Sequence, residues 1–143
     1  MLFRSQDEPE WFHILGLAYR RENRIDDAIK MYDKAVALAP NEARYQLALG
    51  VAWRRKDDPD KAIPYYKRAT ELDPGNADAW FDLGFMYKRN KENDAAINAW
   101  QTYLTLNCKL KDEAARKRIS EELAGIGGKA TGCGPAPKKS KRK

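Results

Sequence analysis

The side chains that most often carry out chemistry in proteins are few in this sequence and lie far apart. The 143 residues include one histidine, His13, and two cysteines, Cys108 and Cys133. A metal site or a nucleophilic site needs several such groups at close spacing, and the sequence contains no Gly-rich phosphate loop and no arguable Ser, His and Asp set. We therefore expect no catalytic residue, no metal ligand, no cofactor and no enzymatic activity.

Carboxylates are plentiful, but they gather where helices are expected to begin. Acidic runs occur at 26–27, 57–60 and 92–94. Acidic side chains at a helix start accept hydrogen bonds from free backbone N–H groups and interact favourably with the helix dipole. We therefore interpret these runs as helix caps rather than as acid–base pairs.

The cysteines allow two interpretations. A bridge between Cys108 and Cys133 is one, and two reduced thiols in a cytosol-like compartment is the interpretation that we favour. The N-terminal residues turn acidic at Asp7 without the long apolar stretch of a secretory signal, and no apolar run approaches the roughly 18 residues that span a bilayer. We expect a cytoplasmic protein.

The net charge of +6 is confined to the last residues of the chain. Residues 127–143 hold six basic residues and no acidic one, and removing those six from the 27 Lys and Arg leaves 21, which equals the 21 Asp and Glu. This segment is rich in Gly, Pro and Lys and lacks bulky apolar residues, so we expect a flexible, disordered basic tail. Its basic end consists of Lys138, Lys139, Lys141, Arg142 and Lys143.

The strongest pattern in the sequence is an internal repeat with a period of 34 residues. Leu-Gly pairs recur at 15–16, 49–50 and 83–84. Further residues of matching type recur at the same interval: Tyr19, Trp53 and Tyr87; Ala28, Ala62 and Ala96; Tyr32, Tyr66 and Trp100. Within each repeat the spacings of three and four residues predict two helices, each with one apolar face. Proline follows the second helix at 40 and 74, where it prevents the helix from continuing.

This pattern resembles the tetratricopeptide repeat (TPR) family over residues 9–42, 43–76 and 77–110. The resemblance implies an all-α fold, a right-handed α-solenoid of three helix-turn-helix repeats. In the third unit, Tyr103 stands where the others have Ala and Cys108 stands where they have Pro, which indicates the terminal repeat.

The flanking segments are expected to complete the stack. Residues 1–8 form an N-terminal lead. Residues 111–126 place Ala115, Ile119, Leu123 and Ile126 on one helix face among charged residues, which predicts a capping helix for the last exposed repeat. The alternative for this segment is a basic amphipathic helix that binds a membrane or a partner.

The resemblance also implies that the first helices of the repeats line a concave groove. Their side chains opposite the core form our predicted partner-binding set: His13, Leu17, Arg20, Leu47, Val51, Arg54, Asp78, Phe81, Asp82, Phe85 and Lys88. The apolar members would form an exposed strip, which commonly marks a binding site. The alternative is that some of them pack under neighbouring helices. The basic members either contact a partner or simply complement the negative ends of the helix dipoles.

Some TPR domains clamp the C-terminal carboxylates of heat-shock chaperones with Lys, Asn and Arg from the first helices. The matching positions here are His13, Leu17, Ala48, Asp78 and Asp82, none of which is the expected residue. We therefore predict a non-enzymatic adaptor or scaffold for complex assembly, which binds an apolar or aromatic segment with acidic flanks. The alternative is a protein attached to nucleic acid or an anionic surface through its basic tail, weakly and salt-sensitively. In a eukaryote the end of the tail would match a nuclear-import signal.

Overall fold

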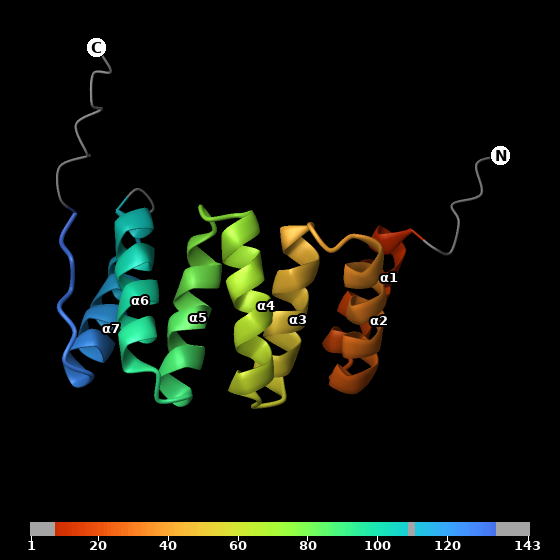
Figure 1. The fold of residues 1–143 in the computed structure, drawn as a ribbon, viewed down its shortest axis with the longest axis horizontal. Helices are drawn as coiled ribbons and strands as arrows, with labels where there is room; N and C mark the ends of the chain where they lie inside the picture. The colour runs from red at the N-terminus through yellow and green to blue at the C-terminus, as the bar shows by residue number, and fades with distance from the viewer. Residues whose placement is uncertain (1–7, 109–110, 134–143) are drawn as a thin grey trace, which may run out of the picture.

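The computed structural model describes residues 8–108 and 111–133, which form seven α-helices and contain no strand. The helices are α1 (Pro9–Arg21), α2 (Ile25–Leu38), α3 (Ala43–Arg55), α4 (Pro59–Leu72), α5 (Ala77–Arg89), α6 (Asn93–Asn107) and α7 (Glu113–Gly125). They follow one another along the long axis of the molecule, with α1 at one end and α7 at the other (Figure 1). The predicted all-α solenoid of three helix pairs and a final helix is confirmed.

Local sequence explains where several helices begin and where the chain turns. Three helices start with a side chain that accepts a hydrogen bond from a backbone N–H three residues later, namely Asp58, Asn76 and Asp112. The acidic pair at 26–27 lies in the first turn of α2 but makes no cap hydrogen bond. In each repeat the turn between the helices carries one residue with a positive φ of 59–63°, at Asn23, Asp57 and Lys91.

The two helices of each repeat pack through a small residue against a ring. In the first repeat Gly16 faces the fully buried ring of Tyr32, and in the second Gly50 faces Tyr66. The absence of a side chain on the glycine lets the two helices approach closely. Between repeats, Leu49 and Ala52 of α3 join the buried core around α2.

The two ends of the stack differ. At the C-terminal end α7 buries Ile119 and Leu123 against α6, which confirms the predicted capping helix. At the other end α1 leaves Trp11 53% and Ile14 49% exposed. The residues 34 positions later, Tyr45 and Ala48 of α3, are both buried, and Ala48 belongs to the core around α2. The corresponding face of α1 has no described helix over it.

The structure contradicts our expectation of reduced thiols. Cys108, at the end of α6, and Cys133 form a disulfide with a Cα–Cα distance of 5.7 Å. The bridge holds the start of the basic segment, where Gln101 Nε2 also donates a hydrogen bond to the Lys129 carbonyl. Residues 127–133 are therefore anchored on α6 and α7, whereas residues 134–143, including the basic end, lie outside the described residues. Disulfides persist mainly in oxidising compartments, so the cysteines no longer support the prediction of a cytoplasmic location.

Candidate functional site

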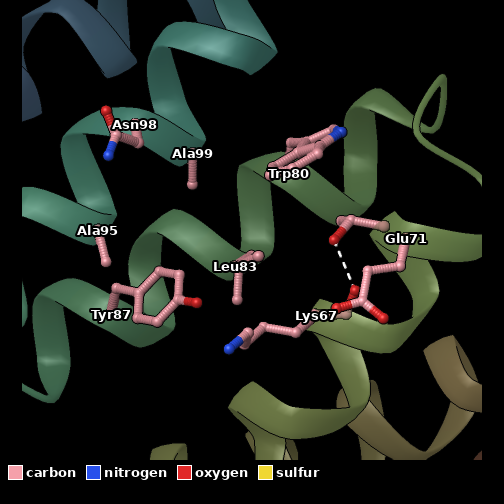
Figure 2. Close-up of a pocket in the computed structure, with 9 residues that line it drawn as sticks. Lys67, Glu71, Trp80, Leu83, Tyr87, Ala95, Asn98 and Ala99 are labelled. Carbon is pink, nitrogen blue, oxygen red and sulfur yellow. Dashed lines mark hydrogen bonds between the residues drawn. The ribbon is translucent and has the colours of Figure 1, made fainter.

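The predicted binding residues lie on α1, α3 and α5, the first helices of the repeats. Contacts between α1 and α3 bypass α2, so these first helices lie together along one side of the stack. We call the surface formed by the eleven predicted residues the first-helix face. None of them lines the pocket in Figure 2, which is formed by residues of α4, α5 and α6, among them Lys67, Trp80 and Tyr87.

The apolar side chains of the first-helix face are half-buried rather than fully exposed. Leu47 and Val51 of α3 pack partly against the core between α4 and α5. Leu17 of α1 is half-buried as well. The strip is therefore neither fully exposed nor fully packed under neighbouring helices, which were our two interpretations. Each of these side chains contacts the core and keeps part of its surface in solvent.

The last helix covers the apolar strip at its C-terminal end. Phe81 and Phe85 of α5 contact each other with ring centroids 5.1 Å apart, and Phe85 meets the ring of Trp100 edge-on at 5.0 Å. The guanidinium of Arg118 in α7 lies over both phenylalanines, 5.6 and 4.7 Å from their centroids. Cation–π contacts of this kind stabilise the position of α7 against the two phenylalanines. The open part of the strip is therefore the part formed by α1 and α3.

The three basic residues of the first-helix face, Arg20, Arg54 and Lys88, differ in their contacts, because two of them are neutralised within the chain. Arg54 Nη1 lies 2.7 Å from Asp82 Oδ1, and Lys88 forms an ion pair with Glu122 of α7. Arg20 forms no ion pair with any residue in the described ranges. The dipole interpretation applies equally to all three positions, so it does not account for this difference.

Asp82 is the most strongly constrained carboxylate of the first-helix face. Its side chain is 17% exposed, and its Oδ2 accepts a hydrogen bond of 3.2 Å from the hydroxyl of Tyr66. Burial raises the pKa of Asp82, and the nearby charge of Arg54 opposes that rise. This carboxylate ties α5 to both helices of the second repeat. Asp78, one turn earlier, is exposed.

His13 lies in a cluster of aromatic rings at the N-terminal end of the face. Its ring centroid is 5.1 Å from that of Tyr45 and 5.9 Å from that of Tyr32. Burial lowers the pKa of His13. Beside it, Glu10 accepts hydrogen bonds from Tyr45 Oη at 2.9 Å and Arg44 Nη2 at 3.1 Å, and the Tyr45 bond is the main reason why the pKa of Glu10 is lowered.

Sequence reasoning missed two features of this face. The sequence indicates Tyr32 only as a member of the repeat pattern, yet its hydroxyl is a buried polar group without a hydrogen-bond partner among the described residues. The cover that Arg118 provides for the phenylalanines was also not predicted, because the position of α7 has no counterpart in the repeat. The unpaired hydroxyl of Tyr32 has a signal in the sequence. Asp82 accepts the hydrogen bond of Tyr66, and the residue 34 positions before Asp82 is Ala48, which has no carboxylate.

No three His, Cys, Asp or Glu side chains within 8–108 and 111–133 come together as a metal site. None of the described helices has the length and apolar character that crossing a membrane would need.

Comparison with known proteins agrees with this architecture. Two tetratricopeptide repeat models match residues 15–77 and 65–98, which together span more than half of the chain. No curated protein sequence matches the chain.

Among solved structures, a crystal structure of MamA superposes with a TM-score of 0.77 at 29% identity, covering 86% of this chain and 71% of that one. A second MamA structure gives a TM-score of 0.75 at 30% identity, with coverage of 85% and 65%. The TPR2B domain of yeast Sti1, in a complex named for pHsp70, gives a TM-score of 0.72 at 19% identity, with coverage of 83% and 95%, and so shares the fold. The chain belongs to the tetratricopeptide repeat family and has the general character of a protein-interaction module.

Proposed function

We propose that this protein is a non-enzymatic adaptor whose first-helix face binds a short segment of a partner protein during the assembly of a larger complex. The observation that carries the proposal is the open apolar strip of Leu17, Leu47 and Val51. These side chains keep solvent-exposed surface, and α7 does not cover them as it covers Phe81 and Phe85. Exposed apolar surface rimmed by polar residues is characteristic of protein-binding sites.

The chemistry of the rim favours a particular segment. Arg20, which has no ion-pair partner among the described residues, adds a positive charge beside the strip, so a partner segment with apolar or aromatic residues and acidic flanks fits best. The related Sti1 domain was solved in a complex named for pHsp70, which supports peptide binding as a use of this fold. The carboxylate-clamp positions differ, so we do not extend that partner to this chain.

A display selection followed by titration tests the proposal. Peptides selected from a random library on the full chain would be titrated against Leu17→Glu and Leu47→Glu. Leu38→Glu is the matched control, because Leu38 is 49% exposed on a second helix. We expect the first two variants to lose at least about tenfold in affinity, because a charge would be buried against an apolar segment, and the control to bind like the parent. Equal binding by all three variants would refute the assignment of the face.

The alternative function rests on the basic end of the tail, which lies outside the described residues and stays a prediction from the sequence. It is tested in the full chain by replacing Lys138, Lys139, Lys141, Arg142 and Lys143 with Gln. Binding to duplex DNA and to anionic vesicles would then be compared at two salt concentrations. Salt-sensitive binding that disappears in this variant supports the alternative, and peptide binding that persists supports the adaptor.

A further inference from the structure

The second repeat contains a three-residue arrangement that ties three helices together. Arg54 of α3 and Tyr66 of α4 both contact the carboxylate of Asp82 on α5, at 2.7 and 3.2 Å. The ring of Tyr66 is fully buried against Gly50. The guanidinium and the hydroxyl therefore point toward one place at the base of the first-helix face, and Asp82 fills that place.

The same arrangement recurs 34 residues earlier without its carboxylate. Arg20 of α1 and Tyr32 of α2 occupy the positions of Arg54 and Tyr66, but Ala48 of α3 stands where Asp82 would be. Tyr32 packs on Gly16 as Tyr66 packs on Gly50, so the ring is held in the same way. The first repeat therefore keeps the two groups that hold a carboxylate and lacks the acid that they would hold.

Two polar groups at this place are buried without a hydrogen-bond partner among the described residues. Tyr32 is 0% exposed, and its hydroxyl has no hydrogen-bond partner within the described ranges. The same is true of the buried Nδ1 atom of His13, whose ring lies 5.9 Å from that of Tyr32. Buried polar groups are almost always paired, so two unpaired groups beside each other require an explanation.

The electrostatics of this place favour an anion. Burial raises the pKa of Tyr32, and the positive charges of Arg20 and Arg55 both oppose that rise. Glu10 acts electrostatically on His13, but its carboxylate is already held by Tyr45 and Arg44. Two cations therefore act on the hydroxyl without a described carboxylate to balance them.

We propose that Arg20 and Tyr32, with His13 beside them, form a binding site for one carboxylate of a partner segment, which occupies the place that Asp82 fills in the next repeat. The inference rests on the proposed function of the first-helix face and specifies its ligand chemistry. Its two main donors differ from those of a chaperone-type clamp, because Arg20 and Tyr32 are not among the clamp positions, whereas His13 beside them is one. The carboxylate comes from an Asp or Glu side chain or from a chain end, and the test separates these sources.

The probes are three peptides that differ only in their carboxylates. Acetyl-Phe-Ala-Glu-Phe-amide carries a side-chain carboxylate, acetyl-Phe-Ala-Gln-Phe carries a terminal one, and acetyl-Phe-Ala-Gln-Phe-amide carries none. Each is titrated into the full ¹⁵N-labelled chain, with the amide of Val51 reporting occupancy of the strip and the amide of Ala48 reporting the site. We expect at least about tenfold tighter binding of a carboxylate peptide than of the uncharged one, as for a charged hydrogen-bond partner.

Variants of the chain test which residues hold the carboxylate. Ala48→Asp supplies the missing acid from within the chain and is expected to remove the advantage of the carboxylate peptide, whereas Ala48→Asn, which has a side chain of similar size, retains some of it. Arg20→Gln should abolish the advantage. Tyr32→Phe should reduce it about fivefold, while raising the unfolding temperature, because it deletes an unpaired buried hydroxyl.

The outcomes separate the two proposals. Equal affinity for all three peptides, with shifts at Val51, would refute the carboxylate site and leave the binding face in place. If no peptide shifts Val51 or Ala48, the binding face fails for aromatic segments and the carboxylate site falls with it. Should Ala48→Asp not fold, Arg20→Gln and Tyr32→Phe still decide the matter, since unchanged peptide preference in both would overturn the assignment.

Discussion

The repeated glycine of the first helix provides a graded test of how these repeats pack. Each of the three glycines faces a fully buried ring of the second helix. A Cβ placed on the glycine would lie 3.0 Å from Tyr66 in the second repeat, 2.4 Å from Tyr32 in the first and 2.2 Å from Trp100 in the third. The same substitution at equivalent positions should therefore have three different effects.

Two opposing terms determine the size of each effect. Replacing Gly by Ala within a helix gains about 1 kcal/mol of helix propensity. Overpacking a well-packed core costs about 1–3 kcal/mol. At Gly50 the ring needs to move only slightly, so the two terms cancel and the free energy of unfolding changes by about zero. At Gly16 the larger displacement leaves a net loss of about 1 kcal/mol.

The third repeat should lose the most stability. The closest atom to a Cβ at Gly84 is Nε1 of Trp100, which also donates a hydrogen bond of 3.3 Å to the carbonyl of Phe81. Moving the indole costs about 3 kcal/mol of overpacking and about 1 kcal/mol for the hydrogen bond, offset by the helix term. We expect Gly84→Ala to lower the free energy of unfolding by about 3 kcal/mol, or the unfolding temperature by about 10 °C.

Urea unfolding followed by circular dichroism and by tryptophan fluorescence measures these differences. Gly125→Ala at the end of α7 is the control, because no described atom lies within 4 Å of its added Cβ. The reasoning is refuted if Gly50→Ala destabilises the protein as much as Gly84→Ala, or if Gly84→Ala is neutral. Either result would show that the close glycine–ring contacts do not limit packing.

Three further predictions concern ionisation and the disulfide. Because burial lowers the folded-state pKa of His13, the resonance of its imidazole should titrate below the ordinary value of 6.5. Its contribution to the free energy of unfolding is then present above pH 6.5 and is lost as the pH falls below 6.5. Titration at or above 6.5 would contradict this. The pKa of Asp82 is raised, so the native state holds its proton more tightly than the unfolded state does. The parent should therefore lose stability relative to Asp82→Asn as the pH rises above 3.8, the ordinary pKa of Asp. Urea midpoints of both proteins across acidic pH measure this difference. Reducing the Cys108–Cys133 bridge, which closes a loop of 25 residues, should lower the free energy of unfolding by about 3 kcal/mol. Counting free thiols with and without reductant establishes whether the bridge is present. Unchanged stability of Cys133→Ser would refute its stabilising role.

The fold was predictable because its determinants are local and repeated. The 34-residue interval of Leu-Gly pairs and aromatic residues places one apolar face on each helix. Helix pairing between neighbours in the chain then follows, since each repeat contacts mainly the next. The capping helix was predictable for the same reason, because its apolar spacing matches the face that the last repeat would otherwise expose.

The candidate site was predictable only in part. The sequence placed Arg20, Arg54 and Asp82 on the first helices, but not which of them neutralise each other. The pairing of Arg54 with Asp82 depends on how α3 and α5 approach, at a separation of 28 residues. The disulfide between the end of α6 and the tail has the same origin, because two distant thiols become partners only when the folded chain brings them together.

The sequence by itself determined the repeat, the helices and the face on which charged and apolar side chains gather, because these follow from the periodic spacing of residues along a helix. Only the tertiary structure decided which of those side chains remain available. Arg118 covers two phenylalanines, and Asp82 neutralises Arg54, while Arg20 and Tyr32 keep no described partner. Whether a side chain is available to a partner depends on the distances between helices, and the spacing of residues along the sequence does not determine those distances.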